Sequence, residues 1–105
     1  MADEYKNIQG FDRLIHEPAR MAIMAVLYAS ESADFKYLLH ATNLTKGNLS
    51  AQLRKLNEAG YLTITKGFQG NYPHTTCALT KAGRKAFRAY RKQVVSLAKK
   101  FQAED

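Results

Sequence analysis

Apolar side chains recur at three- and four-residue steps through the first part of the chain, which predicts a series of helices separated by short breaks. Pro18 opens the second helix, because proline is tolerated in a first turn, where its missing N–H would have had no partner. Apolar residues lie nearly all round that segment, "MAIMAVL", so this helix is expected at the centre of the fold. The expected helices span about 7–15, 18–28, 34–43 and 45–59.

Short polar residues mark the boundaries of the last two of these helices. Asp34 and Thr45 are expected N-caps, because their side-chain oxygens can accept hydrogen bonds from the free N–H groups of a first turn. Asn43 is expected to end one helix, and Gly60 to form a left-handed cap after the next. Three leucines on one face of the helix at 45–59 predict a buried stripe: Leu49, Leu53 and Leu56.

After Gly60 the apolar period changes from helical to alternating and then becomes helical again. Residues 61–66 and the segment "TTCAL" are expected to be the strands of a hairpin, with a long tip at "GFQGNYPH". Thr80 is the expected N-cap of a long helix whose apolar residues form a heptad-like seam, which predicts a partner along its length. The seam, and hence the expected dimer interface, consists of Phe87, Tyr90, Val94, Leu97 and Phe101.

This order of helices, hairpin and long final helix is that of a winged helix-turn-helix domain. The expected fold class is therefore mainly α with a small β-hairpin, an α+β arrangement. No repeat and no linker rich in Pro, Gly or Ser divides the sequence, so residues 1–105 are expected to form one domain. Within it, 34–43 would be the supporting helix, 45–59 the recognition helix, and about 80–102 the dimerisation helix.

Charge is distributed unevenly along the chain, although the formal total is +7. Residues 46–100 hold 12 Lys and Arg against the single acid Glu58, a net of +11. Residues 1–45 hold four Lys and Arg against six Asp and Glu, a net of −2, and Glu104 and Asp105 add another −2. A basic region confined to one part of the fold favours a polyanionic partner.

The expected recognition helix in "LTKGNLSAQLRKLNEAGYL" carries hydrogen-bonding and basic side chains opposite its leucines. An α-helix fits the major groove of B-DNA, where such a surface can approach base edges. Asn48, Ser50 and Gln52 are the expected base contacts, and A·T pairs are expected beneath them because Asn and Gln can pair bidentately with adenine. The expected phosphate contacts are Thr45, Lys46, Arg54, Lys55 and Lys66, with Gly47 on the same small polar surface and Gln69 and Asn71 on the hairpin tip.

Four stretches together resemble the single-domain winged-helix transcriptional regulators of archaea and bacteria that are related to the MarR and ArsR families. The resemblance runs from about residue 11 to 93, in "FDRLIHEPARMAIMAVL", "LTKGNLSAQLRKLNEAGYL", "KGFQGNYPHTT" and "LTKAGRKAFRAY". It implies a homodimer joined by its long terminal helices, with residues 45–55 in successive major grooves and wings, 66–74, in the adjacent minor grooves. Such a protein is expected to bind a roughly palindromic site and to repress by occluding the promoter, with a small-molecule effector left open.

Other function classes find little support in the residues. Cys77 is the one cysteine, so neither an internal disulfide nor a thiolate metal site is expected, and a reducing cytoplasmic setting fits best. His16, His40 and His74 are not at metal-ligand spacing, in contrast to the ArsR metal sensors. No catalytic constellation or cofactor motif emerges, so neither an enzyme nor a cofactor is expected. The N-terminus has no signal-peptide pattern, and the longest apolar run is too short to cross a bilayer.

Two alternatives to a duplex DNA partner stay open. The domain could be an interaction module that presents its wing or long helix to another protein. It could also bind RNA, for which Phe68 and Tyr72 at the hairpin tip would offer stacking surfaces, although these aromatics could equally pack back on the domain.

Overall fold

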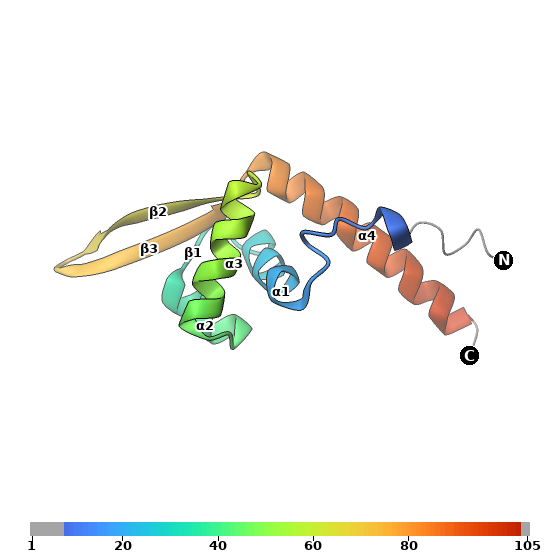
Figure 1. The fold of residues 1–105 in the computed structure, drawn as a ribbon, viewed down its shortest axis with the longest axis horizontal. Helices are drawn as coiled ribbons and strands as arrows, with labels where there is room; N and C mark the ends of the chain where they lie inside the picture. Colours follow the sequence, from blue (N-terminus) through green and yellow to red (C-terminus); the bar gives the residue numbers. More distant parts are fainter. Residues whose placement is uncertain (1–7, 104–105) are drawn as a thin grey trace.

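The computed structural model describes residues 8–103, which fold into four α-helices and a three-stranded antiparallel sheet (Figure 1). The element order confirms the predicted α+β winged-helix fold with a long C-terminal helix. In chain order the elements are α1 (Pro18–Tyr28), β1 (Ala33–Asp34), α2 (Phe35–Thr42), α3 (Lys46–Glu58), β2 (Leu62–Gln69), β3 (Tyr72–Leu79) and α4 (Lys81–Ala103).

The sheet has the strand order β1-β3-β2, so the predicted two-stranded hairpin was incomplete. β2 and β3 form the hairpin, and β1 pairs with the other edge of β3, with Ala33 opposite Cys77 and Asp34 opposite Thr76. A strand of two residues is too short to show the alternation by which strands are recognised in a sequence. Because β1 runs directly into α2, this pairing attaches the supporting helix to the base of the wing.

The hairpin tip is a tight turn, and the prediction of a long loop there was wrong. The strands remain paired as far as Gln69 and Tyr72, which leaves a two-residue turn that begins at Gly70. Gly70 has φ +65°, a conformation that glycine adopts readily and that the first position of a type II′ hairpin turn requires. Gly67 and Pro73 fall within the predicted loop "GFQGNYPH", but a strand with a neighbour on one side only tolerates both.

The segment before α1 is not the helix predicted at 7–15. Residue 7 lies outside the described part of the chain, and residues 8–10 form a single 3₁₀ turn. The carboxylate of Asp12 then accepts hydrogen bonds from the backbone N–H groups of Leu14 and Ile15, at 2.9 and 3.3 Å. Such a local side-chain bond competes with helical hydrogen bonding, which explains why an apolar helical spacing did not give a helix. Phe11 and Ile15 still reach the core, as the spacing required.

The predicted helix ends are confirmed. Asp34, Thr45 and Thr80 each accept a hydrogen bond from the backbone N–H three residues ahead, at 2.7, 3.1 and 3.0 Å. Asn43 and Gly60 have φ values of +56° and +81°, in the left-handed region expected for helix C-termini. These caps fix where α2, α3 and α4 begin and end, and hence how the helix-turn-helix is oriented.

The hydrophobic core surrounds α1, as its nearly continuous apolar surface predicted. Ile23, Met24 and Leu27 of α1 are fully buried, and they pack with the inward faces of α2, α3 and the sheet. α4 joins this core through its first half, where Phe87 and Tyr90 are 8% and 2% exposed. These two residues of the predicted dimer seam therefore belong to the core of their own chain.

A close contact between α4 and the connection from α3 to β2 depends on a glycine. A Cβ atom on Gly83 would lie 2.0 Å from the carbonyl oxygen of Tyr61. That carbonyl also accepts the backbone N–H of Thr80 at 3.0 Å, and the Thr80 hydroxyl donates to the carbonyl of Gly60 at 2.6 Å. The start of α4 is thus fixed to the junction of the recognition helix and the wing.

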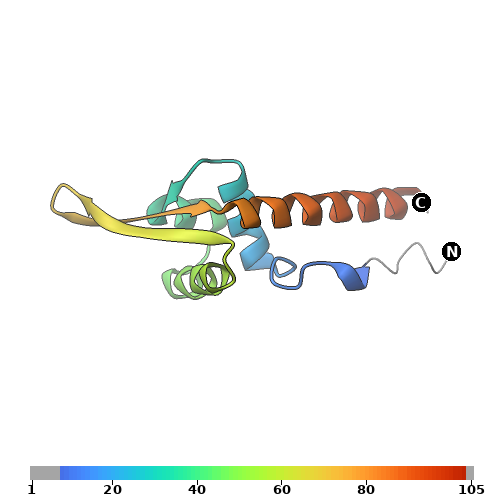
Figure 2. The ribbon, with the colours of Figure 1, turned by 90° about the horizontal axis from the view of Figure 1, so that it is seen from above.

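The molecule is elongated because two elements leave the core in opposite directions. Figure 2 shows the wing extending to one side of the helices and the later turns of α4 to the other, and the principal extents are 59 × 25 × 22 Å. The recognition helix lies between these two extensions (Figure 1).

Candidate nucleic-acid interface

The outer face of α3 carries the residues predicted to contact DNA. Leu49, Leu53 and Leu56 are 0%, 3% and 0% exposed, so the predicted leucine stripe holds this helix against the core. Gln52 is half-buried between the two faces. The remaining predicted contacts on and before α3 are exposed: Thr45, Lys46, Gly47, Asn48, Ser50, Arg54 and Lys55.

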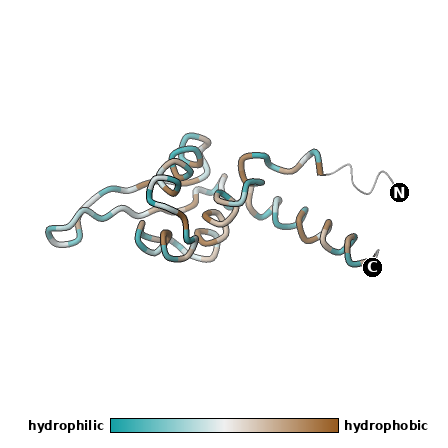
Figure 3. The backbone as a smooth tube through the Cα atoms, turned by 60° about the horizontal axis from the view of Figure 1, so that its bottom comes forward, coloured by the Kyte–Doolittle hydropathy of each residue, from teal (hydrophilic) through white to brown (hydrophobic). Residues whose placement is uncertain are grey.

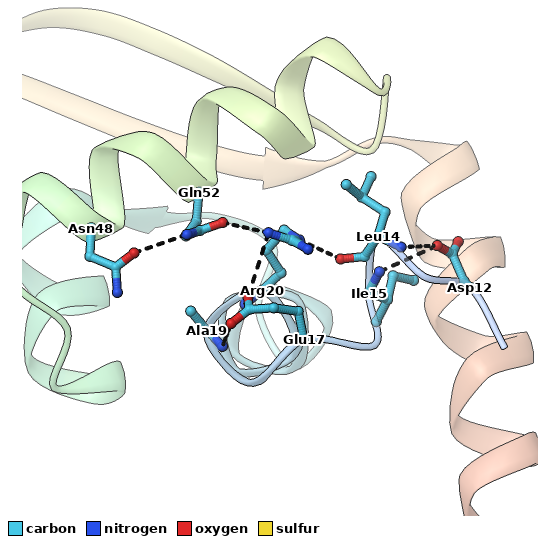
Figure 4. Close-up of polar contacts among 8 residues, drawn as sticks. All are labelled: Asp12, Leu14, Ile15, Glu17, Ala19, Arg20, Asn48 and Gln52. Atoms are coloured by element: carbon cyan, nitrogen blue, oxygen red, sulfur yellow. Dashed lines mark hydrogen bonds and ion pairs between the residues drawn. The ribbon is translucent and has the colours of Figure 1, made fainter.

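Gln52 and Asn48 are joined by a hydrogen bond, and Gln52 is bonded in turn to an arginine on α1 (Figure 4). Arg20 Nη1 lies 2.7 Å from Gln52 Oε1, and Gln52 Nε2 lies 2.9 Å from Asn48 Oδ1. Arg20 Nε also donates to the carbonyl oxygen of Leu14 at 2.5 Å. The two amides predicted to read bases are therefore part of a network that begins behind the recognition helix.

Glu17 supports this network from the start of α1, where it is the N-cap. Its carboxylate accepts from the backbone N–H groups of Ala19 and Arg20 at 3.1 and 2.9 Å, and one oxygen lies 3.6 Å from Arg20 Nη1. The backbone N–H of Arg20 is the main cause that lowers the pKa of Glu17, and the charges of Arg20 and Lys55 lower it further. Glu17 therefore stays ionised beside the guanidinium.

Sequence reasoning did not assign Arg20 or Glu17 to the site. The stretch "HEPAR" does contain a signal for Glu17, because proline marks a helix start and a negative side chain is stabilised by the free N–H groups there. No pattern within α1 shows that Arg20 reaches Gln52, 32 positions later in the chain. That contact depends on how α1 and α3 cross.

A groove of about 800 Å³ joins the recognition helix to the wing. Ser50 and Arg54 of α3 and Lys66 of β2 all line it, so the structure brings these three predicted contacts to one surface. A second groove, of about 420 Å³, is lined by Lys46 at the start of α3 and Gln69 near the wing tip. Five of the predicted contacts therefore line grooves that α3 shares with the wing, and such concave surfaces can follow a nucleic-acid backbone.

The wing tip is exposed on both faces. All residues from 65 to 73 are exposed, including Asn71 in the turn. Phe68 and Tyr72 are 76% and 78% exposed, so they do not pack back on the domain. Phe68 lies opposite Pro73 and Tyr72 opposite Gln69, and because neighbouring positions along a strand alternate, the two aromatic rings lie on opposite faces of the ribbon.

The outer half of α4 keeps an apolar surface that the core of its own chain does not cover completely. Figure 3 shows hydrophobic residues recurring between hydrophilic ones to the C-terminal end of this helix. Val94 and Leu97 are half-buried, whereas Val95 and Phe101 are 48% and 54% exposed. The part of the predicted seam that a second chain could cover therefore begins at Val94.

Cys77 and His74, which were considered for redox or metal chemistry, both lie on β3. Cys77 is 1% exposed, and burial raises the pKa of its thiol to about 11, which disfavours a reactive thiolate. His74 Nε2 lies 3.4 Å from Asp34 Oδ2 at the base of the wing, and the pKa of Asp34 is lowered first by the N–H of Tyr37 and then by His74. Within residues 8–103, no group of three or more His, Cys, Asp or Glu could hold a metal ion. The helices in this range are all too short or too polar to cross a membrane.

Comparison with known proteins identifies relatives across nearly the whole chain. A family model described as a winged helix DNA-binding domain matches residues 19–98. An uncharacterized protein of Methanocaldococcus jannaschii is 33% identical over 90 residues, which make up 86% of this chain and 98% of that protein.

Two solved structures share the fold over similar lengths. A transcriptional regulator homologue from Pyrococcus horikoshii OT3 has a TM-score of 0.78 and 25% identity, with 98% of each chain covered. A transcriptional regulator of the MarR family from Enterococcus faecalis V583 has a TM-score of 0.75 and 17% identity, covering 93% of this chain and 87% of the other. At 17% identity, the likeness to the MarR-family regulator is one of fold alone.

Proposed function

The chain belongs to the winged helix DNA-binding domain family, and we propose that it is a homodimeric repressor that binds a specific site in duplex DNA. This membership, with a MarR-family regulator among its fold neighbours, confirms the resemblance predicted from the sequence, and the fold is that of DNA-binding transcriptional regulators. The observation that carries the proposal is the outer face of α3. It is exposed, rich in hydrogen-bonding and basic groups, acid-free until Glu58 at its last position, and it continues through a groove to Lys66.

Duplex DNA fits this surface in both shape and charge. α3 would enter the major groove, with base edges facing Asn48, Ser50 and Gln52. Its capped N-terminus would favour a phosphate, because the free N–H groups and the helix dipole carry partial positive charge there. The wing would reach the adjacent minor groove, and the remaining basic residues would contact phosphates: Lys46, Arg54, Lys55 and Lys66.

The outer half of α4 supports the proposed homodimer. Val94, Val95, Leu97 and Phe101 offer apolar area, while the basic side chains around them repel a second copy, so the apolar contact has to drive association. Leu97→Glu is expected to give a monomer in sedimentation equilibrium. Lys99→Glu places the same carboxylate about 200° round the helix and should remain dimeric. A monomeric unmodified protein at tens of micromolar would contradict the dimer.

The first test is binding of the purified protein to two duplexes, a fragment of its own promoter and an unrelated sequence, across a salt series. We expect tight binding to the promoter over a weaker background that falls steeply as salt increases. Repression by occlusion predicts that the protected site overlaps the promoter. Equal affinity for both duplexes would contradict sequence specificity, and no binding at low salt would favour the alternative of a protein partner.

RNA is the second candidate partner, because Phe68 and Tyr72 are open to stacking at the wing tip. Their positions on opposite faces of the ribbon do not allow both rings to enclose one base. Competition between the promoter duplex and a single-stranded RNA of equal length separates the two candidates. Displacement of the duplex by a smaller amount of RNA would favour the RNA-binding role.

A small-molecule effector stays a prediction, as does the cytoplasmic location that action on promoters would require. A cavity of about 200 Å³ lies between Phe11 and α4, where Gln93, Ser96 and Leu97 are among its lining residues. Because this cavity lies next to the proposed dimer helices, a ligand bound in it would be coupled to dimer formation. Promoter affinity that changes when a small molecule raises the thermal midpoint would support an effector.

A further inference from the structure

Arg20 determines which atoms donate and which accept in the two hydrogen bonds that link Arg20, Gln52 and Asn48. A guanidinium group has donors only, so the atom of Gln52 that faces Arg20 has to be its oxygen. The NH₂ group of Gln52 then faces Asn48, and the atom of Asn48 that meets it has to be an oxygen as well. The NH₂ group of Asn48 is consequently directed away from Gln52 (Figure 4). Without such an anchor, either amide could turn by 180° at little steric cost.

Arg20 is itself well fixed. Its side chain is 13% exposed, and it is bonded to the carbonyl of Leu14 and paired with the carboxylate of Glu17. Glu17 is held by the backbone of α1, which it caps. Arg20 therefore anchors the network from α1, behind the recognition helix. The far end of the network, Asn48, is exposed on the first turn of α3.

We propose that Arg20 and Gln52 are positioning residues that orient the amide of Asn48, and that Asn48 is the side chain of α3 that selects adenine. This inference rests on the proposed DNA-binding function. It changes the role expected for Gln52, whose oxygen and one N–H are already used within the protein. Asn48 keeps its NH₂ donors and one oxygen lone pair for a base.

The fixed orientation of Asn48 matches the major-groove edge of adenine. Its Nδ2 can donate to purine N7, and the remaining lone pair of its Oδ1 can accept from the N6 amino group of adenine. Guanine presents the oxygen O6 in place of that amino group, so two acceptors would face each other. An Asn48 amide turned the other way would lose this match, and discrimination depends on the anchor for that reason.

The test measures base preference with duplexes selected from a randomised pool by the unmodified protein, followed by single base-pair changes in the selected site. Arg20→Met keeps most of the length of the side chain but removes its donors. Gln52→Glu keeps an acceptor for Arg20 but has no donor for Asn48, so Asn48 has to turn its NH₂ inward. Arg13→Met is the matched control, because it removes one exposed positive charge from outside the network.

For the unmodified protein and Arg13→Met, we expect one position to prefer adenine by on the order of tenfold. Arg20→Met and Gln52→Glu should lose most of that preference while other positions of the site keep theirs. In the Asn48→Ala background, Arg20→Met should cause no further loss at this position, since the reading group is already absent. Circular dichroism melting identifies any variant whose loss reflects unfolding, and Gln52→Glu tests the proposal if Arg20→Met does not fold.

Full adenine preference in a folded Gln52→Glu protein would overturn the proposal, as would an equal loss at every position of the site. Binding of all variants to unrelated duplex is measured in the same salt series. Absence of that binding in the unmodified protein would contradict the DNA-binding function itself. Binding with unchanged base preference in the variants would contradict only the positioning role.

Discussion

The recognition helix and the wing line the same groove but are supported in opposite ways. α3 rests on three buried leucines, and its outward amides are connected to an arginine of α1. The wing from 65 to 73 is exposed on all sides and is held by the pairing of its own two strands. Base recognition needs a side chain in a fixed orientation, whereas a phosphate contact needs only charge within reach. We therefore expect α3 to determine sequence preference and the wing to add salt-dependent affinity.

Leu49→Ala should have the largest effect, because it removes the support of α3 beside Asn48. Leu49 is fully buried, and truncation of a buried leucine lowers the free energy of unfolding by about 2–5 kcal/mol. Urea denaturation followed by circular dichroism measures this change. Gln69→Ala, on the exposed wing, is the control and should stay within about 0.5 kcal/mol of the unmodified protein. Equal losses in the two variants would show that the wing is as tightly integrated as α3.

Gly83→Ala should have the next largest effect, because it strikes the junction between the two regions. The new Cβ would lie 2.0 Å from the carbonyl oxygen of Tyr61, a backbone atom that cannot move aside as a flexible side chain can. We expect a loss of about 1–3 kcal/mol on unfolding, as for other overpacked sites. Gly47→Ala in α3 is the matched control, since its Cβ would meet nothing within 4 Å. A Gly83→Ala protein as stable as Gly47→Ala would contradict this account of the junction.

The sequence predicted the ends of the helices better than the extent of the strands. Thr45 and Thr80 could be predicted as caps because capping is a local interaction, in which a short polar side chain accepts a hydrogen bond from a backbone N–H three residues ahead. The hairpin tip was misread because Gly67 and Pro73 are turn residues in most contexts, and only the exposed position of the wing lets a strand contain them. The two-residue β1 had no periodic signal, since its pairing with β3 is a tertiary contact.

Helical spacing predicted which side chains of α3 face outward, but the hydrogen bonds among the predicted site residues could not be predicted from the sequence. Helical spacing shows which side chains of α3 lie opposite the leucines, and most of them are exposed in the structure. Spacing does not show that Gln52 bonds to Arg20, because this depends on the crossing of α1 and α3. Spacing also could not show which residues of the heptad-like seam of α4 face a second chain, since Phe87 and Tyr90 fit a dimer pattern and a core pattern equally well.

Lys55→Ala and Lys66→Ala compare a phosphate contact on α3 with one on the wing. Each should weaken binding to all duplexes alike and reduce the slope of log affinity against log salt by about 0.9. Both side chains are exposed, so thermal midpoints should not change. Titration of promoter and unrelated duplexes between low and moderate salt measures the slope. A change of base preference with an unchanged slope in Lys66→Ala would show that the wing, and not α3 alone, reads sequence.

Phe68→Ser and Tyr72→Ser should have the smallest effects on stability, because both rings are already more than three-quarters exposed. We expect each to change the free energy of unfolding by less than about 0.5 kcal/mol, as for other surface substitutions. Promoter affinity should fall only modestly, and by a similar factor for unrelated duplex, if the rings pack against the minor-groove backbone. Urea denaturation and the same salt titration measure both quantities. A loss confined to single-stranded RNA would instead assign the two rings to stacking, and the wing would then serve a different nucleic acid from α3.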